Sequence, residues 1–194
     1  MQVEQEMVVG EEDVRYVNDE LYEDVFRFYR ESSEWTGPAT HEPEAEAVVV
    51  REARLLDQRN YESWLDLYVP RCVYWVPGRE IVGDPREEPA LHFDDHRRLV
   101  DRVALIRTGF LHAQTPPSVT CRLVGSLETR RHSASVSDVF STLLIDAYRR
   151  ETHVQFTGRQ VHRIVKAQDS WAIQYRVLLL NDRAGSQGNI TFIL

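Results

Sequence analysis

Residues 92–127 read HFDDHRRLVDRVALIRTGFLHAQTPPSVTCRLVGSL. The first part predicts a helix over residues 94–107, because its apolar side chains recur at helical spacing and Asp94 or Asp95 can cap it. The apolar face of that helix consists of Leu99, Val103 and Ile106. Two adjacent prolines at 116 and 117 separate the helix from an extended segment that begins at residue 119. The stretch therefore predicts a helix, a proline-stopped loop and a strand in succession.

After residue 117 the hydrophobic period changes to two residues, which is typical of β-strands. In the first strand apolar and polar residues alternate: Val119, Cys121, Leu123 and Leu127 with Thr120, Arg122, Ser126 and Glu128. Longer strands are predicted over residues 133–149, 154–166 and 171–177, and residues 191–194 are a candidate tail strand. The second half of the chain is therefore predicted to be a sheet of sequential strands.

The first half of the chain is predicted to be mainly helical. An apolar stripe predicts a helix over residues 18–31, and a break that contains Gly and Pro follows over residues 36–43. Thr40 is the expected N-cap of a second helix that runs to about residue 60. That helix is expected to bury Ala45, Val48, Val49, Ala53 and Leu56. The remaining elements are a short helix over residues 61–68 that Pro70 ends, a strand over residues 72–76 and a loop over residues 78–91.

Helices followed by long sequential strands with short turns predict an α+β fold. We expect a curved antiparallel sheet with the helices on one face, because long strands twist and coil, which closes the sheet into a cone over the helices. This is the cone-shaped fold of the nuclear-transport-factor-2-like, or cystatin-like, kind. Residues 1–40 are predicted to be an N-terminal arm with a helix, and residues 41–194 a single α+β cone domain.

The composition is that of a soluble globular protein, with 28% charged and 42% hydrophobic residues. The net charge of −8 and the lack of a dominant basic face argue against nucleic-acid binding. No membrane span and no secretory signal are apparent, and two cysteines make no disulfide framework, so a cytoplasmic location is expected. The chain has 22 arginines and one lysine, which genome composition or a need for interfacial pairing could cause.

Several pieces together resemble the small (β) subunit of bacterial aromatic ring-hydroxylating dioxygenases, the Rieske non-haem iron oxygenases. Besides the opening stretch they are residues 51–57 with Trp64-Leu65, residues 74–77, Gly158-Arg159 and residues 179–182. No single piece is specific, but their order and spacing are. The resemblance covers roughly residues 45–194, while the first forty residues match only loosely and, in the family, commonly wrap a neighbouring subunit.

The resemblance implies a structural subunit without catalytic, cofactor-binding or metal-binding residues of its own. The enzyme would be an α3β3 hexamer whose large (α) subunit carries a Rieske [2Fe-2S] cluster and a mononuclear Fe(II). Electrons from NAD(P)H would arrive through a reductase and often a ferredoxin, and both atoms of O2 would enter an aromatic ring to give a cis-dihydrodiol. Substrate range would be set mainly by the large subunit.

The residues of this chain give little support to an iron centre within it. A Rieske cluster needs Cys-x-His and Cys-x-x-His hooks, and neither Cys72 nor Cys121 lies in one, so both are expected to pack as small hydrophobes. His92 and His96 have the four-residue spacing of a helical metal site. However, an aspartate cap would leave His92 outside the helix, and Phe93 stands where the zincin signature needs Glu.

Two other functions remain open for a chain of this fold. A stand-alone dehydratase or isomerase could use Asp95, His96, Tyr61 and Tyr68 in the mouth of the cone, provided that burial raises the pKa of one carboxyl. A ligand-binding scaffold without catalysis is the other alternative. The remaining histidines are scattered singly and are interpreted as structural polar residues: His41, His112, His132, His153 and His162.

If the chain is an assembly subunit, its arginine-rich helix and its sheet should face neighbouring subunits. Arginine–carboxylate pairs at such contacts fix orientation more than they add affinity. The candidate interface residues are Arg97, Arg98, Arg102 and Arg107 on the helix and Asn181, Asp182 and Arg183 after the last long strand. We expect the partner to be the large oxygenase subunit.

Overall fold

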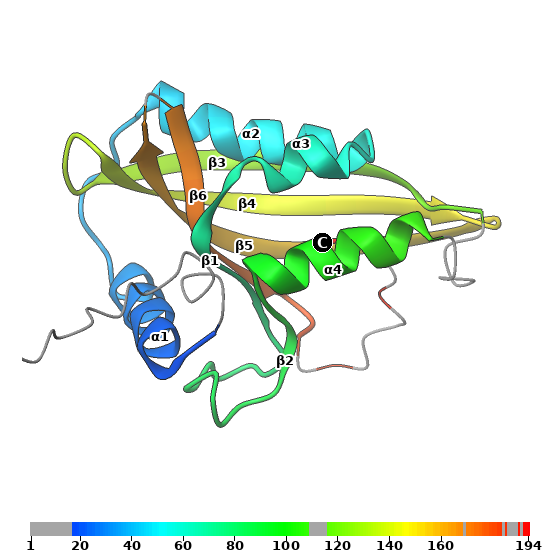
Figure 1. Ribbon diagram of the computed structural model, residues 1–194, viewed down its shortest axis with the longest axis horizontal. Coiled ribbons are helices and arrows are strands. Elements are labelled where there is room, and N and C mark those ends of the chain that lie inside the picture. Colours follow the sequence, from blue (N-terminus) through cyan, green and yellow to red (C-terminus); the bar gives the residue numbers. More distant parts are fainter. Residues whose placement is uncertain (1–16, 109–115, 169, 184, 186–189, 191) are drawn as a thin grey trace, which may run out of the picture.

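The computed structural model describes residues 17–108, 116–168, 170–183, 185, 190 and 192–194 (Figure 1). The elements are α1 (Asp19–Ser33), α2 (Pro43–Asp57), α3 (Tyr61–Leu65), β1 (Tyr68–Pro77), β2 (Ala90–Asp95), α4 (His96–Arg107), β3 (Val119–Arg131), β4 (Val136–Arg149), β5 (Thr152–Ala167) and β6 (Ser170–Leu180). Residues 1–16 of the predicted N-terminal arm, together with His112 and Thr191, lie outside the described residues. The predicted α+β class is confirmed.

The strands form one mixed sheet in the order β2-β1-β6-β5-β4-β3. Strands β3 to β6 pair antiparallel with their chain neighbours, as predicted, because short turns join them. The pairing of β1 with β6 is parallel, so the prediction of a purely antiparallel sheet was wrong at this point. These two strands are far apart in the chain, so no hairpin turn dictates their relative direction. The sheet curves without closing, and β2 and β3 are its edges in the described part of the chain.

The helices cover both faces of the sheet, which corrects the prediction of helices on one face only. Strand side chains alternate between faces. Helices α2, α3 and α4 pack on the face that carries Tyr74, which we call the inner face. Helix α1 packs on the opposite, outer face, against the next residue Trp75. Figure 1 shows α2 and α3 together along one side and α1 apart from them. The apolar stripe of α1 can pack on the outer face because β1 carries apolar side chains on both sides.

Two predictions in the helical half were wrong in detail. Thr40 does not cap α2, whose N-cap is Glu42 without a side-chain bond. Instead Thr40 forms a β-bridge to Thr129, and its hydroxyl donates to the Thr129 carbonyl at 2.8 Å. Pro70 does not end a helix but lies inside β1. It is tolerated there because the register with β6 shifts between Tyr68 and Val73, where no ladder bond is required.

The structure also changes three strand predictions. Strand β2 occupies residues that were predicted to be loop and helix, because residues 90–95 pair with β1. In β3 the predicted strand is present, but Val119 and Leu123 are exposed whereas Arg122 is buried. A bulge at Ser126, whose φ is 50°, then reverses the alternation along the strand. The described tail residues 192–194 form no strand.

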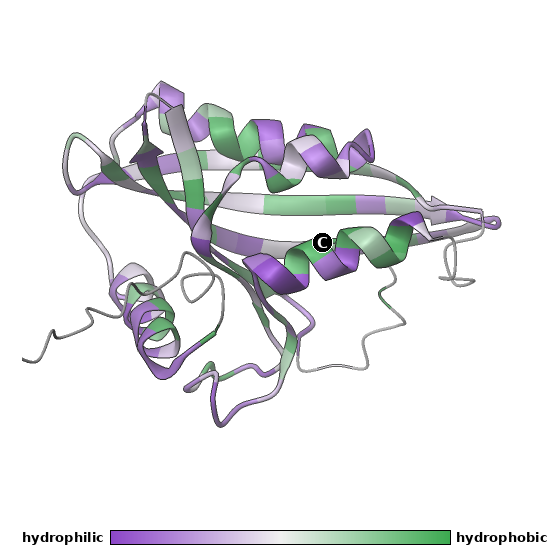
Figure 2. Cartoon of the chain, viewed as in Figure 1, coloured by the Kyte–Doolittle hydropathy of each residue, from purple (hydrophilic) through white to green (hydrophobic). Residues whose placement is uncertain are grey.

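The core has two layers, one on each side of the sheet. The inner layer includes Trp64 from α3 and Leu99 from α4. The outer layer includes Val25 and Phe28 from α1. Figure 2 shows apolar and polar segments alternating along α2 and α4, as expected for helices with one covered face. No helix in the described ranges has the length and apolarity that crossing a membrane requires.

Candidate functional site

Helix α4 begins two residues later than predicted, and Asp95 is its N-cap. The Asp95 carboxylate accepts the backbone N–H of Arg98 at 2.8 Å and that of Val17 at 3.0 Å. The other candidate cap, Asp94, lies within β2. His92 also lies in β2, which confirms that an aspartate cap leaves it outside the helix. The cap therefore fixes the start of α4 and anchors the chain just before α1.

Two of the predicted interface arginines form contacts within the chain. Arg102 donates to Oδ2 of Asp94 from Nε at 2.9 Å and from Nη2 at 2.6 Å. Burial raises the pKa of the Asp94 carboxyl, and Arg102 offsets part of that rise. Arg98 donates from Nη1 to the carbonyl oxygen of Phe93 at 2.8 Å. Both arginines thus hold α4 against the end of β2.

The other two arginines of α4, Arg97 and Arg107, are more exposed than Arg102. Arg97 is half exposed and lies 3.9 Å from an aspartate one turn along the helix. Arg107 forms an exposed ion pair with Glu62 on α3. Val100 and Leu105 expose apolar side chains on the same helix. Arg97 and Val100 are three residues apart and therefore share a helix face, whereas Leu105 is exposed farther along the helix.

The C-terminal interface candidates lie after β6. Asn181 donates from Nδ2 to Oγ1 of Thr157 at 3.0 Å. Arg183 donates to two backbone carbonyls in the segment 79–80, at 2.9 and 2.7 Å, and to a third at the end of β6 at 2.8 Å. Asp182 lies between them in the same turn. These contacts tie the turn after β6 to the loop after β1, so the predicted interface residues form two groups on different elements.

Several exposed apolar side chains gather on the outer face of β3 and β4. Val119 and Leu123 are each 62% exposed, and Tyr148 is 41% exposed. Register places Val119 opposite Tyr148 and Leu123 opposite the half-buried Leu144. We call these four residues the outer apolar patch. Cys121 is exposed on the same strand, so the prediction that it packs as a small hydrophobe was wrong, whereas Cys72 is buried as predicted.

A groove of about 640 Å³ lies beside this patch, between the end of α1 and the outer face. Trp35 stacks on Phe140 in it, with the ring centroids 4.8 Å apart. Thr142 and Arg159 line both this groove and the adjoining hollow that contains Leu123. The groove and the outer apolar patch are therefore parts of one continuous surface.

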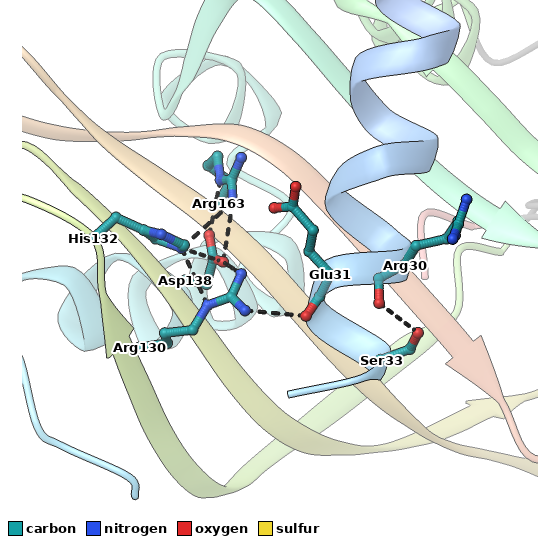
Figure 3. Close-up of polar contacts among 7 residues, drawn as sticks. All are labelled: Arg30, Glu31, Ser33, Arg130, His132, Asp138 and Arg163. Atoms are coloured by element: carbon teal, nitrogen blue, oxygen red, sulfur yellow. Dashed lines mark hydrogen bonds and ion pairs between the residues drawn. The ribbon is translucent and has the colours of Figure 1, made fainter. Parts of the chain in front are cut away.

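A buried carboxylate, Asp138, holds Arg130 where it hydrogen-bonds to the end of α1 on the outer face. Asp138 of β4 is fully buried and accepts from Arg163 at 2.8 Å and from Arg130 at 2.7 Å, with His132 at 2.6 Å. Figure 3 shows these three side chains converging on Asp138, and Arg130 reaching the carbonyl of Glu31 near the end of α1. Burial alone would raise the pKa of Asp138, but Arg163 and His132 lower it below its ordinary value.

A second buried carboxylate lies at the centre of the inner face. Glu52 of α2 is 2% exposed and accepts from Nε1 of Trp64 at 3.3 Å and from the Tyr68 hydroxyl. Nε2 of His162 lies 2.9 Å from its Oε2, and Nε of Arg176 lies 3.5 Å from the same atom. We call these five residues the inner polar cluster. They come from α2, α3, β1, β5 and β6, so the cluster ties the inner helices to the sheet.

Burial and neighbouring charges shift the pKa values of two members of the inner polar cluster. Burial alone would raise the pKa of Glu52, but Arg176, His162 and Tyr68 outweigh it and lower the pKa from 4.5 to about 2. Burial lowers the pKa of His162, Arg176 adds to that effect, and Glu52 offsets part of it. The cluster is therefore built on a buried carboxylate–arginine pair, with Nε2 of His162 within hydrogen-bond distance of the same carboxylate.

The four residues considered for a stand-alone dehydratase do not form one set. Asp95 caps α4, and His96 is the first residue of that helix. Tyr68 belongs to the inner polar cluster, and Tyr61 begins α3. Within the described ranges, no three or more His, Cys, Asp or Glu side chains lie close enough to hold a metal ion. On the inner face a buried carboxylate–imidazole contact instead pairs Glu52 with His162, and sequence reasoning missed this pair.

The histidines that are described all have polar or aromatic neighbours. His162 belongs to the inner polar cluster and His132 to the Asp138 cluster. His41 lies 3.1 Å from Glu46, and His153 packs on Tyr148 with the ring centroids 4.7 Å apart. One signal for the inner cluster was present in the sequence. Glu52 falls at helical spacing within the apolar stripe of α2, where a charged residue must find a buried partner.

Comparison with known proteins identifies the family. The family model described as "Ring hydroxylating beta subunit" matches residues 51–184. The chain therefore belongs to the β subunits of aromatic ring-hydroxylating dioxygenases. It is 37% identical to the 2-halobenzoate 1,2-dioxygenase small subunit of Burkholderia cepacia over 42% of this chain and 53% of that protein. It is 32% identical to the toluate 1,2-dioxygenase subunit beta of Pseudomonas putida over 56% of this chain and 70% of that protein.

Solved structures agree on the fold. The β subunit of benzoate 1,2-dioxygenase from Burkholderia mallei superposes with a TM-score of 0.66 at 23% identity, over 81% of this chain and all of that one. A protein from Novosphingobium aromaticivorans, described as NTF2-like with a cystatin-like fold, superposes with a TM-score of 0.54 at 12% identity, over 91% and 98% of the two chains. The predicted cone-type fold class is thereby confirmed.

Proposed function

We propose that this chain is the structural β subunit of a multicomponent dioxygenase that cis-dihydroxylates an aromatic ring. Three copies assemble with three large subunits, and the large subunits carry the Rieske [2Fe-2S] cluster and the mononuclear Fe(II). Electrons from NAD(P)H reach them through a reductase and, in many such systems, a ferredoxin. The observation that carries the proposal is the family match over residues 51–184, which runs from within α2 to the turn after β6.

The surface of the chain supports a role in assembly. Protein interfaces have apolar, aromatic-rich centres with few unpaired charges. The outer apolar patch meets that description, and the neighbouring groove adds the stacked rings of Trp35 and Phe140. Meanwhile the Asp138 cluster holds α1 at the margin of this surface. We therefore propose the outer face as the main contact with the large subunit.

The interface residues that the sequence predicted have a secondary role in this proposal. Arg97 and Arg107, with the exposed side chains of Val100 and Leu105, offer a charged rim for a neighbouring subunit. Arg98 and Arg102 act on assembly indirectly, because they hold α4 in place. The group Asn181, Asp182 and Arg183 contributes through the turn that it stabilises. Rim charges of this kind set orientation and association rate more than affinity.

Copurification with the large subunit tests the proposal. The tagged chain is coexpressed with the partner large subunit, and recovery of that subunit is compared between variants. Leu123→Asp places a charge in the outer apolar patch and is expected to abolish recovery. Val50→Asp makes the same kind of change at a residue that is 46% exposed on α2, and it should leave recovery unchanged. Full recovery with Leu123→Asp would refute the outer face as the interface.

A further inference from the structure

Arg159 lies where the groove beside α1 meets the outer apolar patch. It is exposed on β5, and register places it opposite Thr142 of β4. Residues two apart on a strand share a face of the sheet. Val161, two residues after Arg159, lines the groove, and Thr157, two residues before it, lines the hollow that contains Leu123. The guanidinium group therefore belongs to the middle of the surface that we propose as the contact with the large subunit.

The guanidinium group of Arg159 has no partner within the described part of the chain. No hydrogen bond or ion pair joins it to another described residue. By contrast, Arg130 and Arg163 on the same face of the sheet both bind Asp138. An exposed guanidinium group is hydrated, but a docked protein that covers it removes that water. Burying the charge is strongly unfavourable unless the docked protein supplies an acceptor in place of the water.

A buried hydroxyl from α1 also lacks a partner. Ser32, near the end of the helix, lines the groove and is 6% exposed. Its Oγ has no hydrogen-bond partner among the described residues. A buried polar atom without a partner is destabilising, so an occupant that brings a polar atom into the groove is favoured. Because the stacked rings of Trp35 and Phe140 lie in the same groove, the matching occupant combines polar atoms with an apolar body.

The charges in the groove are separated along its length. Among the described residues that line it, Arg159 is the only basic one and Glu128 the only acidic one. Glu128 lies on the edge strand β3 opposite Phe140, whereas Arg159 lies two strands away on β5. At the usual spacing of strands, the two backbone positions are about 10 Å apart. A negative group is therefore attracted to the Arg159 end of the groove and repelled from the Glu128 end.

We propose that the groove receives an acidic side chain of the large subunit, together with an adjacent aromatic or large apolar side chain. The carboxylate pairs with Arg159, and the apolar side chain packs against Trp35 and Phe140. The anchor rests on the proposed contact between the outer face and the large subunit, and it specifies the chemistry of that contact. Arginine can bind a carboxylate through two parallel hydrogen bonds. Arginine and aromatic side chains in desolvated pockets also carry much of the binding energy in protein interfaces.

The test compares two neutral variants of opposite sign, Arg159→Gln and Glu128→Gln, in the tagged chain coexpressed with the large subunit. Association is measured from the amount of large subunit that stays bound as the purified complex is diluted. Arg159→Gln should weaken association about 30-fold or more, because it leaves the partner's carboxylate buried without a cation. Glu128→Gln removes a charge from the same groove and should not weaken association. Since Arg159 has no partner within the described part of the chain, Arg159→Gln should leave the urea unfolding midpoint unchanged.

Leu123→Asp separates the anchor from the wider proposal. If the unaltered chain recovers no large subunit, or if Leu123→Asp still recovers it, the outer face is not the interface and the anchor is refuted as well. If Leu123→Asp loses the large subunit while Arg159→Gln retains it at every dilution, the anchor alone is refuted. Equal weakening by Arg159→Gln and Glu128→Gln, with a dimer of the chain alone, would assign the groove to a second copy and would also overturn the proposal.

Discussion

Replacing Glu52 by glutamine tests how the inner polar cluster contributes to stability. Glu52→Gln keeps the shape of the side chain but removes the charge that faces the fully buried Arg176. Breaking a buried ion pair by removing one partner costs about 3–5 kcal/mol. The pKa of Glu52, lowered from 4.5 to about 2, gives a similar magnitude of roughly 3 kcal/mol at 1.36 kcal/mol per pKa unit. We therefore expect the free energy of unfolding at pH 7 to fall by about 3 kcal/mol.

Urea unfolding followed by tryptophan fluorescence and circular dichroism measures this loss. The matched control is Glu62→Gln, which removes the same charge from the exposed pair with Arg107 and should cost about 1 kcal/mol or less. The pH dependence supplies a second readout. Because folding lowers the pKa of Glu52, its contribution is present above about pH 4.5 and is lost as the pH falls toward 2. A loss in Glu52→Gln no larger than in Glu62→Gln would refute the reasoning.

Three further predictions concern single side chains. Burial, with Arg102 and Arg176 adding to it, lowers the pKa of His92 to about 4, so the unfolded chain binds a proton more readily and stability should fall as the pH drops from 6.5 to 4. Urea midpoints at pH 7 and pH 5 should differ less in His92→Gln than in the unaltered chain; an equal difference would contradict this. Arg102→Ala should lower the free energy of unfolding by about 2 kcal/mol, because it leaves the buried Asp94 carboxylate without its partner. Arg97→Ala should lower it by less than about 0.5 kcal/mol. Equal unfolding free energies for the two variants would contradict this prediction. With a thiol reagent such as DTNB, Cys121 should react quickly and Cys72 only on unfolding, because burial raises the pKa of the Cys72 thiol; two equally fast thiols would be the opposing result.

Much of the fold could be predicted because its signals are local. The helical stripes of α1, α2 and α4 and the two-residue period of the later strands depend only on neighbours in the chain. The Asp95 cap is local in the same sense, since its acceptor and donor are three residues apart. The family resemblance over residues 45–194 extended these local signals to the cone-type fold, which the comparisons confirmed.

The features that were missed depend on contacts between distant residues. The parallel pairing of β1 with β6 joins segments about a hundred residues apart, and Glu52 meets His162 across 110 residues. The burial of Arg122 could not be predicted from the sequence. The alternation of apolar and polar residues in β3 shows that the strand has two faces, but not which face is covered. Strand β2 has six residues and gains its identity from pairing with β1 more than from its own pattern. Spacing alone could not place these side chains.

Metal content and turnover of the purified proteins test the central claim most directly. The chain alone and the chain coexpressed with its large subunit are assayed for iron, for visible absorption and for O2-dependent conversion of an aromatic substrate with the reductase present. The account predicts iron, colour and cis-dihydrodiol only in the coexpressed complex. Iron bound by the chain alone, or product formed by it without the large subunit, would contradict the account.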